Sequence, residues 1–382
     1  MLSGGFLLIL SGNTSRTEGG EQQSYCQKKR KGGPDKMKAA VFYGKENMRV
    51  EEYPTPEIND NEVLVRVKSA AICGTDVRMY RNGVKNVDED HPLIIGHEMA
   101  GVIEKVGKNV TAYTPGMRVA VAPNMGCGIC EDCIRGNGHM CKEYKALGIS
   151  LNGGFAEYVK VPEAAVRGGN LVPMEDHVTY AEAAITEALS CVYNGSSQCN
   201  IRPGDYVLVI GAGPIGIMHA MMAKMAGAVK VIINDIAENR LELCREIDPS
   251  FITVKDDVIN FVMKETKGHG ADAVITACPV PAAQQTALEV AANYGRICFF
   301  GGLPEDRKMV PLNTNLIHYK QLICTGTTRA SLKQFKDVLG FVSAGIIDVK
   351  KLITAEFSLD EIDKGFELAI AAKGLKNVIN MD

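Results

Sequence analysis

The stretch VLVIGAGPIG, residues 207–216, constrains the fold of this chain more than any other segment. Its first four residues are an apolar strand, its glycines form the pattern G-x-G-x-x-G, and a helix expected to run to Met225 follows. A glycine triplet alone can be no more than a tight turn. Here the strand, the glycines, the helix and a second strand, VIIND, follow one another in the order of a dinucleotide-binding βαβ unit. In such a unit the pyrophosphate of the dinucleotide binds to backbone N–H groups at the positive end of the helix. The predicted loop residues are Gly211, Gly213, Pro214, Ile215 and Gly216.

The second strand ends at a residue that can discriminate between cofactors. Asp235 stands there, at the position where a carboxylate accepts hydrogen bonds from the adenosine ribose and repels a 2′-phosphate. This favours NAD over NADP. Arg240 leaves NADP open, because a guanidinium can bind a phosphate or simply stack on adenine.

Two different sequence patterns predict two domains. Residues 190–328 alternate fully apolar strands with helices, which is typical of a parallel sheet buried on both faces. Residues 37–189 contain short β-rich segments separated by Gly, Pro and Asn, which predict a barrel-like β domain. Residues 329–382 contain two helical patterns, each with a Ser that could cap its helix, and end in NVINMD, which could return as a strand to the β domain. The expected fold class is α/β, with a β-rich domain over 37–189 completed by 329–382, and a doubly wound domain over 190–328.

Residues 1–36 do not resemble the remainder. No basic residue precedes the apolar stretch FLLIL and no small-residue cleavage site follows it, which argues against a signal peptide. The rest of the segment is polar and contains a basic KKRK run, usually a solvated feature. We expect a disordered extension, with Met37 as the functional start.

Composition excludes several classes of function. The 382 residues carry a net charge of −3 and are 46% hydrophobic, which does not indicate a nucleic-acid-binding surface. No apolar run approaches the roughly 20 residues of a membrane span. We therefore expect a soluble protein with a small-molecule substrate and neither a nucleic-acid nor a membrane partner. Cysteines in apolar runs, expected to be buried thiols, fit a reducing cytoplasm; examples are Cys244, Cys278, Cys298 and Cys324.

Residues 127–141, CGICEDCIRGNGHMC, contain four cysteines in the pattern C-x2-C-x2-C-x7-C. An iron–sulfur cluster of the bacterial ferredoxin type would need its fourth cysteine after three residues and then a proline, and Lys142 follows here. Disulfides are typical of small secreted domains. Four thiolates can instead close around one Zn²⁺, leaving no open position for chemistry, so His139 would be a bystander. The predicted structural zinc ligands are Cys127, Cys130, Cys133 and Cys141.

A second, sparser set of ligands points to a reactive metal. Cys73 in AICGTD, His97 in IIGHEMAG and Glu187 in AAITEALSCV together offer sulfur, nitrogen and oxygen, the mixed set of a zinc site with an open position. Each is weak singly, because such residues are more often core, solvated or surface positions.

Taken together, these motifs resemble the zinc-dependent medium-chain dehydrogenase/reductase family, and the similarity runs from Met37 to Asp382. It includes Cys73-Gly-Thr-Asp, Gly96-His97-Glu98, the four-cysteine segment, GGFAEYV, the glycine loop and Asp235. The resemblance implies a GroES-like catalytic domain and a Rossmann domain. Glu187 resembles the polyol, or sorbitol-type, branch; threonine dehydrogenases are similar.

The resemblance also implies roles for single residues. Cys73, His97, Glu98 and Glu187 match ligands of a catalytic zinc, with Glu98 binding directly or intermittently and Glu187 directly or through a water. Thr75 matches the hydroxyl that takes the alcohol proton, and Asp76 matches the carboxylate that orients a zinc-bound imidazole. Arg329 resembles an arginine aimed at the substrate pocket.

Two positions depart from the family pattern. Arg78 stands where many relatives have a histidine, and it cannot accept a proton at working pH. It could instead face a substrate phosphate. Ala188 replaces the usual Pro after the Glu.

These features predict an NAD-dependent enzyme with two Zn²⁺ per subunit, which oxidises a secondary alcohol of a polyol to the ketose. The alternatives are dehydrogenases of the same family for a sugar-alcohol phosphate, L-threonine or 2,3-butanediol. A non-catalytic redox-sensing or structural protein would be expected to have lost ligands that this chain keeps. The resemblance implies a homotetramer or dimer.

Overall fold

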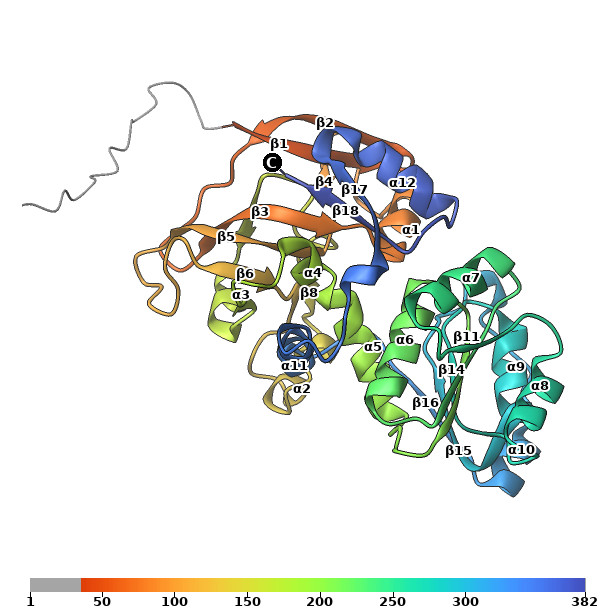
Figure 1. The fold of residues 1–382 in the computed structure, drawn as a ribbon. Coiled ribbons are helices and arrows are strands. Elements are labelled where there is room, and N and C mark those ends of the chain that lie inside the picture. Colours follow the sequence, from red (N-terminus) through yellow and green to blue (C-terminus); the bar gives the residue numbers. More distant parts are fainter. Residues whose placement is uncertain (1–35, 382) are drawn as a thin grey trace, which may run out of the picture. The chain divides into compact units, whose positions relative to one another are not determined.

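The computed structural model describes residues 36–381 (Figure 1). The predicted extension therefore lies outside the described residues, except for Lys36, which already belongs to the first strand.

Mostly antiparallel strands build the first part of the fold. A three-stranded sheet has the order β2 (Asn47–Pro54), β1 (Lys36–Gly44) and β4 (Leu93–Ile94). A seven-stranded sheet has the order β10 (Leu171–Pro173), β6 (Arg118–Val121), β5 (Glu98–Val106), β3 (Val63–Ala71), β18 (Lys376–Asn380) and β17 (Ile353–Ser358), with β9 (Tyr158–Val161) also paired to β3. The one parallel pair among its described strands is β17 with β18. A short ribbon joins β7 (Asn124–Met125) to β8 (Lys145–Ala146). Their inward residues form one apolar core.

The C-terminal strands belong to this sheet. In Figure 1 the blue strand β18 lies beside the orange strand β3, with which it pairs antiparallel. The residues NVIN, 377–380, thus return to the β-rich part, as expected. Ala71 at the end of β3 is opposite Glu98 of β5 on one side and Val378 of β18 on the other. This register brings three chain segments together beside Cys73.

A six-stranded parallel sheet builds the second part of the fold. Its order is β13 (Ile252–Val254), β12 (Lys230–Asn234), β11 (Tyr206–Ile210), β14 (Ala271–Thr276), β15 (Ala291–Phe299) and β16 (Ile323–Gly326). Side chains alternate between its faces, since Val207 and Val209 belong to one core cluster and Leu208 and Ile210 to another. Both faces are buried, which explains the fully apolar strands. The predicted α/β class is confirmed.

Twelve helices connect or cover these sheets within residues 36–381. They are α1 (Gly74–Asn82), α2 (Glu131–Ile134), α3 (Glu163–Gly168), α4 (Tyr180–Ala184), α5 (Thr186–Gln198), α6 (Pro214–Met225), α7 (Glu238–Ile247), α8 (Val258–Glu265), α9 (Pro281–Val290), α10 (Thr314–Lys320), α11 (Leu332–Ser343) and α12 (Ile362–Ile370). Helix α5 runs across the expected domain boundary between residues 189 and 190, and that boundary stays a prediction. Among residues 36–381, no helix is long and apolar enough to cross a membrane.

Two local predictions need correction. Ser331 caps α11 as expected, but Ser358 does not cap α12, because a short 3-10 turn (Leu359–Glu361) intervenes and Glu361 is the N-cap. Cys324 is exposed rather than buried. It lies on β16, which is the last strand of its sheet, so one side of the strand has no neighbouring strand to cover it.

Candidate functional site

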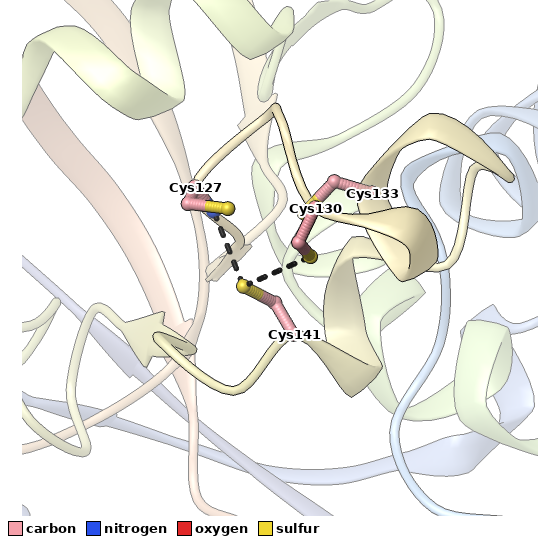
Figure 2. Close-up of side chains that lie close together, drawn as sticks. All are labelled: Cys127, Cys130, Cys133 and Cys141. Carbon is pink, nitrogen blue, oxygen red and sulfur yellow. Dashed lines mark hydrogen bonds between the residues drawn. The ribbon is translucent and has the colours of Figure 1, made fainter.

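The four predicted thiolate ligands converge on one point (Figure 2). Cys127 follows β7, Cys130 and Cys133 lie at the start of and within α2, and Cys141 follows a 3-10 turn (Gly138–Met140). Their Sγ atoms all lie within 4.8 Å of one another. The N–H groups of Cys127 and Glu143 both donate to the Cys141 Sγ, at 3.3 Å each. We call residues 126–141 the cysteine lobe.

The donor set of the lobe fits a zinc ion. The N–H groups of Ile129 and Cys130 lower the pKa of the Cys127 thiol to about 7, whereas burial raises the pKa of the Cys133 thiol to about 12. Four thiols so close cannot all ionise without a cation at their centre. A Cβ at Gly126 would lie 2.5 Å from the Cys133 Sγ, so only glycine leaves room for this sulfur. None of the cysteines among residues 36–381 forms a disulfide, and the lobe could hold a structural zinc.

A second group of ligands lies where β3, α1 and β5 meet. Cys73 is the N-cap of α1, His97 directly precedes β5, and Glu98 is the first residue of that strand. One ligand atom from each lies within 4.8 Å of the other two. His97 and Glu98 are buried and Cys73 is half-buried. Residues that are 24 positions apart in sequence are thus brought together by the pairing of Ala71 with Glu98.

Asp76 organises this group from a fully buried position. Its Oδ2 accepts the N–H of Cys73 at 2.8 Å, and its Oδ1 lies 3.2 Å from the Nδ1 of His97. Burial lowers the pKa of His97, but the charges of Asp76 and Cys73 outweigh burial and raise it overall. The Nε2 lone pair that a proton would take is the one a metal would bind, so metal binding and protonation of His97 compete.

Glu187 lies on α5, which packs against β5, but it stands outside the three-ligand group. Its carboxyl is buried, and burial together with the charge of Glu98 raises its pKa, while His97 acts in the opposite direction. The thiol of Cys191, one helical turn further, donates to its Oε1 at 3.4 Å. The structure therefore brings three of the four predicted ligands together and leaves Glu187 beside them.

Lys376 is a member of this site that the sequence interpretation missed. Its Nζ lies 2.8 Å from Oε1 and 2.6 Å from Oε2 of Glu98, and it donates to the carbonyl of Ile72 at 3.1 Å. Both side chains of this ion pair are buried, and although burial opposes it, the charge of Glu98 raises the pKa of Lys376. A lysine within the apolar strand LKNVIN was the signal that could have found it.

Thr75 and Arg78 lie on the first turns of α1. The Nη2 of Arg78 donates to the Oγ1 of Thr75 at 3.4 Å. Arg78 is exposed, and it forms no ion pair within residues 36–381. A guanidinium thus stands beside the hydroxyl predicted to take the substrate proton.

Arg329 does not pair with a carboxylate in the part of the chain that the structure describes. Its Nη1 donates to the carbonyl of His139 at 2.9 Å, and its guanidinium carbon lies 3.8 Å from the ring centroid of Tyr144. Tyr144 is a second residue that the sequence interpretation missed. Burial raises the pKa of its phenol to about 12, while the charge of Arg329 acts in the opposite direction.

The glycine loop has the predicted geometry. It connects β11 to α6, whose N-cap is Gly213 and whose first residue is Pro214, followed by Ile215. A Cβ at Gly216 would lie 1.7 Å from the carbonyl oxygen of Gly211, so helix and strand approach too closely for any side chain there. The first N–H groups of α6 remain available to a pyrophosphate.

Asp235 follows β12 and contacts this loop. Its Oδ2 accepts the N–H of Ala212 at 2.7 Å, and its Oδ1 accepts that of Ala237 at 2.9 Å. Arg240 Nη1 lies 3.7 Å from the same carboxylate. The predicted cofactor residues Asp235 and Arg240 therefore lie beside the glycine loop.

Comparisons with known proteins match both parts of the chain. Two family models match, "Alcohol dehydrogenase GroES-like domain" over residues 59–173 and "Zinc-binding dehydrogenase" over residues 214–344. Sorbitol dehydrogenase of Bacillus subtilis is 32% identical over 344 residues, which are 89% of this chain and 95% of that protein. L-threonine 3-dehydrogenase of Bacillus licheniformis is 36% identical over 342 residues, which are 87% of this chain and 95% of that protein.

Solved structures share the fold. One reported as a zinc-binding dehydrogenase from Sinorhizobium meliloti, bound to NADP, is 26% identical with a TM-score of 0.82, covering 91% of this chain and 100% of that chain. Fold, cysteine lobe and glycine loop together define a zinc-binding dehydrogenase. The chain belongs to the zinc-dependent medium-chain dehydrogenase/reductase family and is an oxidoreductase of the zinc-containing alcohol dehydrogenase type. The family resemblance inferred from its motifs is confirmed.

Proposed function

We propose that this protein oxidises a secondary alcohol of a polyol to the ketose, with NAD as the hydride acceptor. The observation that carries the proposal is the buried group of Cys73, His97 and Glu98, with Glu187 beside it. Carboxylates rather than a further thiolate complete this ligand set, as in the sequence pattern of the polyol branch. The sorbitol dehydrogenase relative supports the same substrate class.

The residues around this group have complementary tasks. Bound Zn²⁺ would supply a Lewis acid that lowers the pKa of the alcohol, and NAD would accept the hydride. Cys73 and His97 would hold the metal, and Asp76 keeps His97 in the orientation that directs Nε2 toward it. Thr75, on the first turn of α1, would accept the substrate proton through its hydroxyl.

Glu98 and Glu187 offer the remaining oxygen atoms. Lys376 neutralises Glu98 at 2.6 Å, so Glu98 would be an intermittent ligand that returns to the lysine when water or substrate binds. Glu187 would act through a water, because it lies outside the group whose ligand atoms are within 4.8 Å of one another.

We favour NAD over NADP because the Asp235 carboxylate is buried and held by two backbone N–H groups at the edge of the glycine loop. A fixed negative charge there repels a 2′-phosphate. The structural relative is bound to NADP, so a fold of this kind can accommodate either cofactor. We therefore expect the side chain at position 235 to determine which cofactor this chain prefers.

The experiment is a substrate panel followed by NADH absorbance. Sorbitol and L-iditol should be turned over, whereas Cys73→Ala should lose at least about 1000-fold in kcat/KM, since a three-ligand site cannot hold its metal with two. Cys324→Ser, an exposed cysteine far along the chain, is the control that should keep wild-type rates. Full turnover by Cys73→Ala, or by protein stripped of all zinc, would exclude this mechanism.

A second candidate is an alcohol that carries an anionic group, either a sugar-alcohol phosphate or L-threonine. The observation that favours it is the exposed Arg78, which donates to Thr75 and has no carboxylate partner within residues 36–381. Such a guanidinium can bind a phosphate or carboxylate in a bidentate manner. The threonine dehydrogenase relative supports this class.

Arg78→Gln separates the two candidates. Loss of a charged hydrogen bond should raise KM for the anionic alcohol about 10- to 100-fold. The matched control is Arg81→Gln, one turn further along α1. Equal effects of Arg78→Gln on sorbitol and sorbitol 6-phosphate would show that Arg78 does not recognise the anion; neutral 2,3-butanediol completes the panel.

We also propose a homo-oligomer that works in a reducing compartment such as the cytoplasm. Strand β16 is an edge of the parallel sheet and exposes Ile323; Tyr319, four residues earlier, and Tyr294, on the neighbouring strand β15, are also exposed. An unpaired apolar edge of this kind is a template for pairing with a second copy of the chain. The cysteines among residues 36–381 are free thiols, which supports a reducing compartment.

A further inference from the structure

The backbone of Arg329 is fixed by the helix that carries Glu187. Its φ is +57°, a left-handed conformation that costs energy in a residue other than glycine. Its carbonyl accepts from the Nδ2 of Asn194 in α5 at 2.9 Å, and the Oδ1 of Asn194 accepts from Gln334 at 2.9 Å. These bonds hold a strained turn in place, and its side chain therefore leaves the backbone in a set direction.

That direction is toward the cysteine lobe. Arg329 Nη1 donates to the carbonyl of His139, which lies between the ligands Cys133 and Cys141 in sequence. His139 is buried, and burial and the charge of Arg329 lower the pKa of its imidazole. A cationic side chain from residue 329 thus contacts the loop that the four thiolates close.

The same guanidinium covers the ring of Tyr144, three residues beyond Cys141. The guanidinium carbon lies 3.8 Å from the ring centroid, which is within cation–π range. The hydroxyl of Tyr144 donates to the Oδ1 of Asn124 at 2.6 Å, in the strand that enters the lobe. Tyr144 is therefore held at its hydroxyl by Asn124 and over its ring by Arg329.

We propose that Arg329 is a positioning residue that couples the cysteine lobe to Tyr144 and to α5, the helix that carries Glu187. When a metal closes the four thiolates, the carbonyl of His139 would be in place to hold the guanidinium, and the guanidinium would hold the ring of Tyr144. Asn194 ties the backbone of the same residue to α5. When the lobe opens, Arg329 loses one partner and Tyr144 loses its cover. The inference rests on the proposed two-metal function. It assigns Arg329 to Tyr144 and the lobe instead of to a direct contact with substrate.

The absence of tryptophan in this chain makes a direct test possible. Tyr144→Trp introduces the sole tryptophan as a reporter under the guanidinium. In that background, Cys130→Ser should move the emission maximum to longer wavelength and increase quenching by acrylamide about threefold, because the ring loses its cover. Arg329→Met should give the same change, and both substitutions together should add little to either one. Lys142→Met removes an exposed cation beside the lobe and should leave the emission unchanged.

A second measurement tests the coupling in the opposite direction, from Arg329 to the lobe, and can be made even if Cys130→Ser does not fold. Coupling is reciprocal, so Arg329→Met should speed the loss of zinc from the lobe to a chromogenic chelator about threefold to tenfold, with Lys142→Met at the wild-type rate. With Tyr144 unchanged, Arg329→Met should raise KM for the alcohol about tenfold and leave kcat within about twofold.

Two results would overturn the proposal. In the first, Cys130→Ser changes the fluorescence of the Tyr144→Trp reporter as strongly when Arg329→Met is also present as when it is absent. The lobe would then affect the ring by a route that does not include Arg329. The other is a loss of kcat in Arg329→Met as deep as in Cys73→Ala, which would make Arg329 a catalytic residue. The fluorescence and zinc-release measurements need no turnover, so their failure is distinct from a failure of the proposed substrate.

Discussion

His219 is a fully buried imidazole in α6, in contact with Ser196 at 3.2 Å and with the ring of Phe300. Burial lowers its pKa to about 3. The unfolded chain then binds one more proton than the native state between pH 3 and pH 6.5, so stability falls as pH falls through this window. From pH 7.5 to 5.5 we expect a loss of about 1.4 kcal/mol from this group.

His219→Gln keeps a partner for Ser196 and should remove this part of the pH dependence. Urea unfolding at pH 7.5 and 5.5 measures it. The exposed His318→Gln should behave like the wild-type chain. A pH dependence unchanged in His219→Gln would show that this imidazole is not neutral in the fold.

Asp235 is the single residue that we expect to determine the choice between NAD and NADP. Its carboxylate holds the N–H groups of Ala212 and Ala237, and we expect its charge to repel a 2′-phosphate. Asp235→Ser should therefore raise KM for NAD about tenfold and raise the ratio of NADP to NAD use. Steady-state kinetics with both cofactors measures this. No gain in relative NADP use would count against the assignment of Asp235.

At the scale of elements, β18 connects the C-terminal segment to the group of Cys73, His97 and Glu98 through Lys376. Its ion pair with Glu98 is buried on both sides, and removing one partner leaves an uncompensated charge. Lys376→Met should lower the free energy of unfolding by about 3 kcal/mol. Lys373→Met, an exposed lysine just before the strand, should change it by less than about 0.5 kcal/mol.

Denaturant unfolding compares these variants, and Glu98→Gln should recover part of the loss in the Lys376→Met background. Equal stability of Lys376→Met and Lys373→Met would mean that Glu98 is not charged in the folded protein.

At the scale of the whole molecule, the edge strand β16 is expected to decide assembly. Ile323→Lys places a charge on this edge and should convert the oligomer to monomers at micromolar concentration, as measured by sedimentation velocity. Ile346→Lys is the matched control, because the two isoleucines are 59% and 57% exposed. A wild-type chain that sediments as a monomer, or Ile323→Lys that stays assembled, would contradict the proposed interface.

Much of the fold could be predicted because its signals are local. The strand, glycine loop and helix around Gly211 are contiguous, and the four cysteines lie within fifteen residues, so spacing alone indicates their geometry. Cys73, His97 and Glu98 were found because short motifs mark each one. Lys376 and Tyr144 carry no such motif. A lysine in an apolar strand indicates a buried charge, but its partner Glu98, like the partner Arg329 of Tyr144, lies on a distant segment that local sequence does not identify.

The sequence by itself determined the α/β class, the dinucleotide loop and the cysteine lobe, since hydrophobic period and ligand spacing act over a few turns of chain. Only the tertiary structure decided that Glu187 stands beside the ligand group, that Lys376 neutralises Glu98, and that Arg329 contacts the lobe and Tyr144. The physical reason is that strand register and helix packing set distances between residues far apart in the chain, and those distances determine charge pairing and burial.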